Sequence, residues 1–410
     1  MTSHAETRAR PDAAAQPSSR PTAEIASLNG IRALAVALVF FAHGGLEDVV
    51  PGGLGVTIFF VLSGFLITTL MRREYAASGA VRLRAFYLRR VLRLMPPLFI
   101  VVAAAALLSS LSMIDGAFSS RGMLSVLFYF GNYHVIAFDF SGIPQGMGVV
   151  WSLAVEEHYY LLFPPLAIVL LHSGRPWVAG AVLTALCAAI LGWRCWLTLH
   201  GASASYVEMA TDTRADSILI GCLMAFVRNP TVDPVAPANL RRDTAIAAAC
   251  VALLIATLAY RGDFFRHTAR YTLQSLAIAP LIYVAVTRAA QVPFRWLNSA
   301  SMVYLGTISY TIYLSHQLIL YFVMRHWPLL SWAMTLALTA IITLAVAETM
   351  RRWVERPCTR LRKQLHSRST GNATIRNQVA AVTLPTTPPS ALLSPALWKR
   401  DLGVARRHTR

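Results

Sequence analysis

Residues 28–45 read LNGIRALAVALVFFAHGG, an apolar run that contains one arginine and one histidine. The run continues to about residue 49, and roughly 20 apolar residues are enough for a helix to cross the core of a bilayer. Ionisable residues inside such a helix are costly, so Arg32 and His43 are the first candidates for a function. The segment therefore predicts a transmembrane helix that carries chemistry.

Further apolar runs of similar length follow along the chain. With the first they predict about ten membrane helices, at residues 30–49, 54–71, 94–114, 151–171, 178–199, 214–228, 243–260, 271–288, 300–322 and 329–349. The apolar stretch 123–138 is a further candidate, either a re-entrant or an interfacial segment. Because helices and closed barrels alone satisfy their backbone in lipid, the predicted fold is an all-α, polytopic membrane bundle.

The composition agrees with a membrane protein. Of 410 residues, 56% are hydrophobic and 14% are charged, whereas soluble domains average about 25% charged residues. A net charge of +18 would suggest nucleic-acid binding in a soluble protein. Here the basic residues bracket apolar runs, so we expect the lipid bilayer as a partner and no nucleic acid.

Lysine and arginine also predict the orientation. With the N-terminus in the cytoplasm, the cytoplasmic segments hold 29 of the 37 Lys and Arg residues and the external loops hold six. This excess predicts cytoplasmic N- and C-termini. The predicted organisation is a polar tail (1–27), a transmembrane domain (28–360) and a tail (361–410) whose Pro, Ser and Thr content predicts disorder.

Five cysteines are present, and none stands in a CxxC or Cys/His metal-binding pattern. Isolated cysteines in apolar runs usually behave as small hydrophobic residues. We therefore predict neither a disulfide framework nor a metal site.

Arg32 and His43 are 11 positions apart in the first predicted helix. At about 100° per residue they share one face, and a rise of 1.5 Å per residue separates them by ~16 Å. An arginine near the cytoplasmic face suits the phosphates of coenzyme A, and a histidine this far along suits the thioester of an extended pantetheine arm. The alternative is an arginine that reaches the membrane interface and a histidine bonded to a neighbouring helix.

The second predicted span and the segment before the third add possible contacts. Residues 52–68 read GGLGVTIFFVLSGFLIT, whose small residues permit close helix packing and could leave room for a ligand. Residues 82–97 read RLRAFYLRRVLRLMPP, with Arg89, Arg90 and Arg93 directly before the third span. Guanidinium groups beside a helix N-terminus form an anion site, although simple positive-inside anchoring explains the same pattern.

Acidic and other polar residues interrupt the later spans. Glu156 and Glu157 begin the fourth span, at an expected depth similar to that of His43. A carboxylate beside an imidazole assists a general base, although acidic residues also complement a helix dipole. Further intramembrane polar groups, with a substrate-binding or structural role, are Arg214, Asp216 and His316. Together these residues favour a polar cavity inside the bundle.

These motifs resemble the membrane-bound acyltransferase 3 family over residues 27–360. The matching segments are Arg32–ten residues–His43, GVTIFFVLSGFLI, FYLRRVLRLMPP with Arg90 and Arg93, WSLAVEE, TRADSILIG, LGTISYTIYLSH and the closing Glu355-Arg356-Pro357. The order and spacing follow the family. Three positions depart from its usual pattern: Asn29 and Thr57, where Asp is frequent, and His158, where Gln is frequent.

The resemblance implies a bacterial inner-membrane O-acyltransferase. The donor would be cytoplasmic acetyl-CoA or another acyl-CoA, and the acceptor a hydroxyl of a polysaccharide, a lipid-linked sugar or a similar glycosylated molecule. Family motifs place catalysis at His43, which we expect Glu156 or Glu157 to support. Arg32, Arg90 and Arg93, with Arg89 beside them, would hold the coenzyme A phosphates.

Three alternatives stay open at this point. Transfer could be direct or pass through an acyl-histidine. A transporter or flippase of lipid-linked sugars would predict broken helices at matching positions of two halves, and no such repeat is evident. A lipid-sugar glycosyltransferase could use Glu47 and Asp48, but the loop that holds them is only a few residues long.

Overall fold

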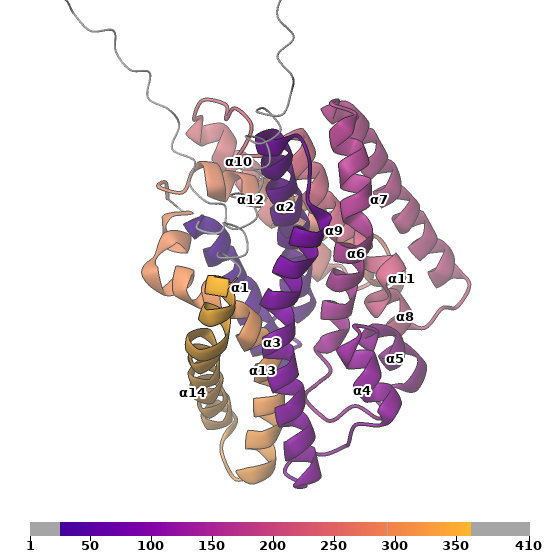
Figure 1. The fold of residues 1–410 in the computed structure, drawn as a ribbon, viewed down its shortest axis with the longest axis vertical. Helices are drawn as coiled ribbons and strands as arrows, with labels where there is room; N and C mark the ends of the chain where they lie inside the picture. Colours follow the sequence, from indigo (N-terminus) through magenta and orange to yellow (C-terminus); the bar gives the residue numbers. More distant parts are fainter. Residues whose placement is uncertain (1–24, 293, 362–410) are drawn as a thin grey trace, which may run out of the picture. The chain divides into compact units, whose positions relative to one another are not determined.

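The structure is a computed structural model that describes residues 25–292 and 294–361. Almost all of the two predicted tails therefore lies outside the described residues. The long helices are α1 (Ala26–Phe41), α2 (Gly52–Ser78), α3 (Leu83–Ser110), α6 (Val150–His172), α7 (Pro176–Leu199), α9 (Thr211–Val227), α10 (Leu240–Ala259), α12 (Ala269–Thr287), α13 (Ala300–His326) and α14 (Trp332–Met350) (Figure 1). No strand occurs in the described part, and the all-α prediction is confirmed.

Each of the ten predicted spans coincides with one long helix. Eight of these, counted within the described residues, are long and apolar enough to cross a membrane. The other two are α9, which has 17 residues, and α13, which carries several polar residues. Both pack against other helices, which bury polar side chains such as Arg214, Asp216 and His316. The chain is therefore a multi-pass membrane protein.

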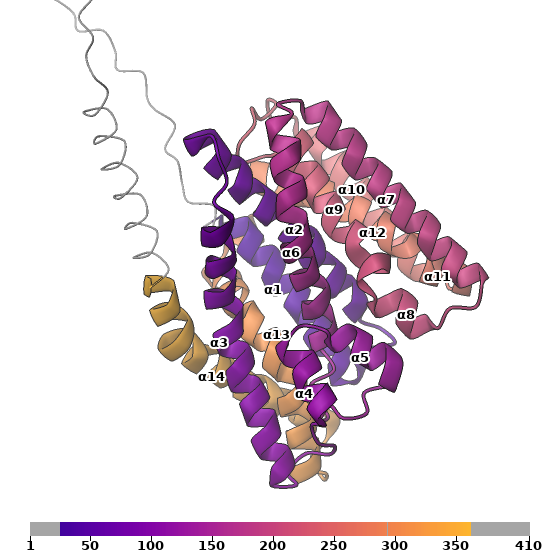
Figure 2. The same cartoon turned by 45° about the vertical axis from the view of Figure 1, so that its right-hand side comes forward.

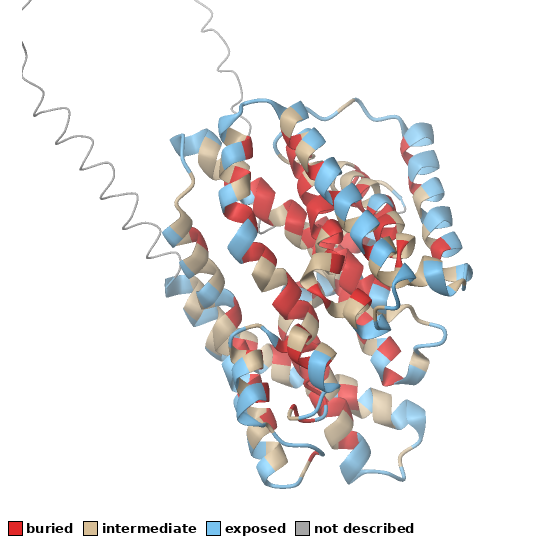
Figure 3. Cartoon of the chain, turned by 90° about the vertical axis from the view of Figure 1, so that its right-hand side faces the viewer, coloured by how far each residue is buried: buried red, intermediate tan, exposed pale blue. Residues whose placement is uncertain are grey.

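Helices at the centre of the bundle differ from those at its edge. α1 packs against α2 and α13, and α2 packs against α9, while α7 and α10 lie outside these four (Figure 2). In an apolar stretch of 18 residues within each helix, 78% of the α2 stretch is buried, whereas 17% of the α10 stretch is buried. Buried residues line the middle of the bundle and exposed ones its outer helices (Figure 3). The exposed surface of α10 includes Leu253 and Ile255, as lipid contact requires.

The contact between α2 and α9 depends on two glycines. A Cβ atom at Gly64 would lie 1.9 Å from the carbonyl oxygen of Ile218, and one at Gly221 would lie 2.0 Å from that of Val61. Such distances exclude any side chain, so each glycine allows the opposite backbone to touch its helix. The small-residue segment 52–68 thus has a packing role, as predicted.

The start of the third helix differs from the prediction, and the structure shows how the stretch 123–138 folds. The third helix begins at Leu83, so its three arginines lie within α3 and not in a loop before it. Hydropathy marks only the apolar part of a helix, while backbone hydrogen bonding continues through Arg, Leu and Tyr residues. The stretch 123–138 does not cross the membrane, because it forms two helices of eight residues, α4 (Ser120–Leu127) and α5 (Gly131–Phe138).

Candidate active site

Arg32 on α1 and His43 in the π-helical turn that follows it both contact α13. The Arg32 Nε donates to the Ser309 hydroxyl oxygen at 3.2 Å, and the His43 Nδ1 lies 2.9 Å from the His316 Nε2. Ser309 and His316 are seven residues apart on α13, which is two helical turns. The prediction that Arg32 and His43 share one face of the first helix is therefore confirmed.

A group of polar residues surrounds Arg32. The Glu156 carboxylate accepts from the Ser63 hydroxyl at 2.9 Å and from the Tyr160 hydroxyl at 3.2 Å. The Arg90 guanidinium lies over the Tyr160 ring, 4.7 Å from its centroid. Glu156, Tyr160 and Arg90 are all electrostatic neighbours of Arg32. We call Arg32, Ser63, Arg90, Glu156 and Tyr160 the Arg32 cluster; it joins α1, α2, α3 and α6.

Two more carboxylates border this cluster. Glu157 has Arg90 and Glu156 as electrostatic neighbours. Glu355 belongs to the π-helical turn η4 (Arg351–Glu355), accepts from the Thr311 hydroxyl at 2.6 Å and is an electrostatic neighbour of Arg32. The closing Glu-Arg-Pro motif is thereby brought to the Arg32 cluster. Arginine side chains therefore lie close to carboxylates there, and charges of opposite sign stabilise one another in a partly buried site.

His43 and His316 form a separate pair at the other end of α1. Their rings lie 5.2 Å apart between centroids and 12° from parallel. His316 is 1% exposed, whereas His43 is exposed. His43 lies in the π-helical turn η2 (Ala42–Leu46), which contains Gly45 with a φ of 94°. The Trp332 indole N–H donates to the Gly44 carbonyl oxygen at 2.7 Å, which fixes this turn against α14.

The expected support of His43 by Glu156 or Glu157 is not present. Within the described residues no hydrogen bond joins His43 to either carboxylate, and Glu156 bonds to Ser63 and Tyr160 instead. Arg32 is an electrostatic neighbour of Glu156, so this carboxylate belongs to the surroundings of Arg32.

The basic residues of α3 have different surroundings. Arg90 faces Tyr160 in the Arg32 cluster, and Arg93 is exposed one turn further along. Arg89 pairs with Glu74 at 3.0 Å, which leaves it less suited to a ligand. Since α3 begins at Leu83, its N-terminal amides lie about two turns away from Arg90. The guanidinium groups therefore lie further from the N-terminus of the helix than the sequence predicted.

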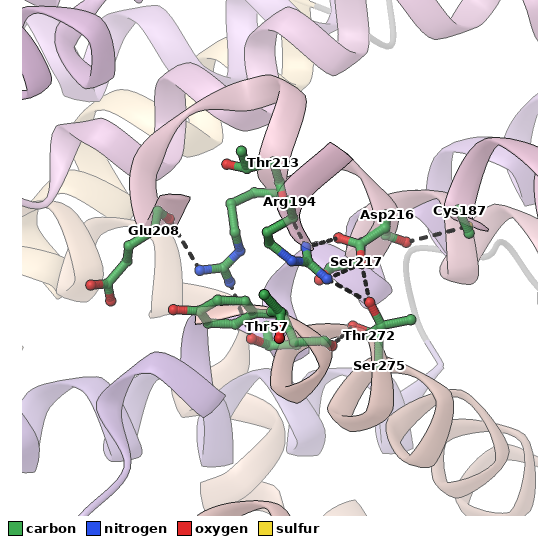
Figure 4. Close-up of polar contacts among 12 residues, drawn as sticks. Thr57, Cys187, Arg194, Glu208, Thr213, Asp216, Ser217, Thr272 and Ser275 are labelled. Carbon is green, nitrogen blue, oxygen red and sulfur yellow. Dashed lines mark hydrogen bonds and ion pairs between the residues drawn. The ribbon is translucent and has the colours of Figure 1, made fainter. Parts of the chain in front are cut away.

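Asp216 pairs with Arg194, and this pairing could not be predicted from the sequence. Both Asp216 oxygens accept from Arg194 on α7, at 3.1 and 3.0 Å, and both side chains are fully buried (Figure 4). The Thr272 hydroxyl also donates to Asp216, at 2.5 Å. We call Arg194, Asp216 and Thr272 the buried ion-pair cluster. The carboxylate of Asp216 is thus paired on both oxygens, while the Arg194 Nε has no hydrogen-bond partner among the described residues.

Arg214 lies beside this cluster, and no carboxylate within residues 25–292 and 294–361 forms an ion pair with it. Its Nη1 donates to the Glu208 carbonyl oxygen at 3.1 Å and its Nη2 to the Thr57 hydroxyl oxygen at 3.3 Å. The guanidinium also lies over the Tyr271 ring, 3.9 Å from its centroid. Thr57 stands where the family frequently has Asp, so this departure removes a negative charge next to Arg214.

A second departure, His158 on α6, contacts neither Arg32 nor His43 through any hydrogen bond or ring contact among the described residues. The His158 Nδ1 is 2.8 Å from the Thr211 hydroxyl oxygen, and its ring lies between Phe130 and Tyr133. His158 therefore connects α6 to α9. In the described part of the chain, no group of three or more His, Cys, Asp or Glu side chains is placed to hold a metal ion.

Ser63 and Tyr160 were not identified from the sequence as site residues. Tyr160 follows Glu156 by four positions, so both side chains lie on one face of α6, and this spacing was a usable signal. Ser63 gave no such signal, because its contact with Glu156 spans 93 residues.

Comparison with known proteins agrees with these motifs. The family model described as an acyltransferase domain matches residues 25–349. The peptidoglycan O-acetyltransferase OatA of Listeria monocytogenes is 31% identical over 309 residues, which cover 71% of this chain and 49% of that protein. The O-acetyltransferase OatA of Staphylococcus aureus is 28% identical over 354 residues, 80% of this chain and 56% of that protein.

The chain thus spans about half the length of these curated relatives. No solved structure matches it. The family model covers more than three quarters of the chain and includes every residue of the Arg32 cluster and both histidines of the pair. The chain belongs to the membrane-bound acyltransferase 3 family.

Proposed function

We propose that the protein is a membrane O-acetyltransferase. It moves an acetyl group from cytoplasmic acetyl-CoA to a hydroxyl of a cell-envelope polysaccharide or a lipid-linked sugar. The family and the named activity of the relatives support this proposal. The observation that carries it is the arrangement of Arg32 and His43 on one helix, with acidic and basic groups around the first and an exposed imidazole at the second.

In this proposal the Arg32 end of α1 binds the donor. Arg32, Arg90 and Arg93 hold the coenzyme A phosphates, because guanidinium groups bind phosphate through paired hydrogen bonds. Glu156 orients Arg32 and keeps Ser63 and Tyr160 in place. The excess of lysine and arginine in the segments at this end supports its location on the cytoplasmic side of a bacterial inner membrane.

The His43 end performs the transfer. The acceptor hydroxyl gives its proton to the His43 imidazole while its oxygen attacks the carbonyl carbon of the thioester. The carbon–sulfur bond then breaks, and the coenzyme A thiolate leaves and takes the proton from the imidazolium. The products are the acetyl ester and coenzyme A with a free thiol.

Donor binding provides the direct test of this function. Purified protein in detergent and in nanodiscs should bind acetyl-CoA with a Kd of about 1 mM or tighter, the range expected of an enzyme substrate. It should also release free thiol when an acceptor oligosaccharide is added. Failure to bind any acyl-CoA in both environments would contradict the proposal and favour a transporter of lipid-linked sugars.

The position of Arg90 predicts a donor-specific defect. Arg90→Ala should raise the KM for acetyl-CoA by about tenfold or more, since a hydrogen bond to a charged group contributes ~1.5–3 kcal/mol. The kcat at saturating donor should change much less. Initial rates over a range of acetyl-CoA concentrations measure both. Arg84→Ala is the matched control, because Arg84 is exposed on the same helix. An equal rise in KM for Arg84→Ala would show a general effect of charge and contradict a specific contact.

A further inference from the structure

The hydrogen bonds of His316 determine where its protons lie. The His316 Nδ1 is 2.7 Å from the Tyr313 carbonyl oxygen and 3.1 Å from the Ile312 carbonyl oxygen. Carbonyl oxygens only accept hydrogen bonds, so the Nδ1 of His316 must carry a proton. His316 is 1% exposed, and burial disfavours a second proton on the ring. Its Nε2 is therefore an acceptor.

The same reasoning extends to His43. Its Nδ1 lies 2.9 Å from the His316 Nε2. Because the His316 Nε2 accepts, the His43 Nδ1 must donate and carries the proton of the neutral ring. The Nε2 of His43 then has a free lone pair. This nitrogen is the ring nitrogen that does not contact His316, and the His43 residue is exposed.

Neighbouring residues hold the His316 ring in this orientation. The Phe40 and Tyr313 rings each lie 6.0 Å from it between centroids. The Tyr313 hydroxyl in turn bonds to the Ser152 hydroxyl at 2.5 Å, which connects α13 to α6. A ring fixed by two carbonyl oxygens and two aromatic neighbours cannot rotate to offer an N–H to His43 without losing these contacts.

We infer that His316 is a positioning residue for the proposed transfer: it accepts the Nδ1 proton of His43 and so leaves the His43 Nε2 as the base. In many active sites a carboxylate accepts a hydrogen bond from the basic histidine and orients it. Here the neutral His316 imidazole has that role. This inference rests on the proposed function only for its kinetic consequence. The protonation pattern of the two rings follows from the hydrogen bonds alone.

Two variants and a control test the kinetic consequence. His316→Leu removes the acceptor and should lower kcat at least about tenfold, with the KM for acetyl-CoA unchanged. His316→Gln keeps an oxygen that can accept and should recover part of that loss. His326→Leu is the control: His326 lies on the same helix, forms the same bond to a carbonyl oxygen four residues earlier and is exposed. Its activity should be normal.

Nitrogen NMR of the histidine side chains tests the protonation pattern without turnover. In protein labelled with 15N-histidine, the His43 signals, assigned by their loss in His43→Gln, should show a protonated Nδ1 and an unprotonated Nε2. In His316→Leu the tautomer with a protonated Nε2 should appear. A protonated Nε2 in the neutral wild-type ring would overturn the inference, as would an unchanged kcat in His316→Leu. If acetyl-CoA is not a donor but the predicted tautomer is found, the proposed function fails and the inferred hydrogen bond stands.

Discussion

His43→Ala is expected to lower the rate of acetyl transfer by about 10²–10⁴-fold, the usual contribution of a general base. Acetyl-CoA binding should remain close to normal, because the groups proposed to hold the donor lie around Arg32, ~16 Å away along α1. Single-turnover rates and equilibrium binding of acetyl-CoA in nanodiscs measure the two effects separately.

The control for this substitution is His200→Ala, since His200 is an exposed histidine at the end of α7. It should leave the rate unchanged. Near-normal turnover by a folded and inserted His43→Ala protein would contradict the proposed base. Glu156 and His316 would then be the next residues to replace. The fold and its membrane helices would not be affected by that result.

Asp216→Leu is expected to be the most destabilising of the substitutions considered. It leaves the fully buried Arg194 without its carboxylate, and breaking a buried ion pair from one side costs ~3–5 kcal/mol. The double variant Arg194→Met with Asp216→Leu should recover most of the loss, because no buried charge then remains unpaired. The unfolding temperatures of the wild type, the single variant and the double variant can be compared in detergent. Either a thiol-reactive fluorescent dye or tryptophan fluorescence reports unfolding.

The exposed ion pair between Asp115 and Arg325 provides the comparison, and Asp115→Asn should hardly change the unfolding temperature. Equal destabilisation by the single and double variants would contradict pairing as the reason for the loss. It would indicate that the shape of the two side chains, and not their charges, stabilises the contact of α7 with α9.

Local features of the site were predictable from the sequence. The ten helices follow from hydropathy, and the shared face of Arg32 and His43 follows from the helical repeat. Contacts between distant segments were not predictable. His316 lies 273 residues from His43, and Ser63 lies 93 residues from Glu156. Periodicity within one helix does not indicate which neighbour it meets, so the carboxylates were assigned to His43 and not to the Arg32 cluster.

The same limit applies to the surroundings of Glu156, which depend on how α6 packs against α1 and α2. Thr57 shows the opposite case. As a departure from the family pattern it was visible in the sequence, but only its contact with Arg214 gives it a physical meaning.

The buried ion-pair cluster also bears on how the protein enters the membrane during synthesis. Arg194 and Asp216 arrive on different helices, and a lone charge at the centre of an inserting helix costs ~2.5–3.5 kcal/mol. α9 has only 17 residues and carries Asp212, Arg214 and Asp216, so it is a poor substrate for insertion alone. Beside α7 the Asp216 charge is neutralised. We therefore expect the translocation machinery to release α7 and α9 into lipid together, as a hairpin joined through α8 (Ala204–Met209).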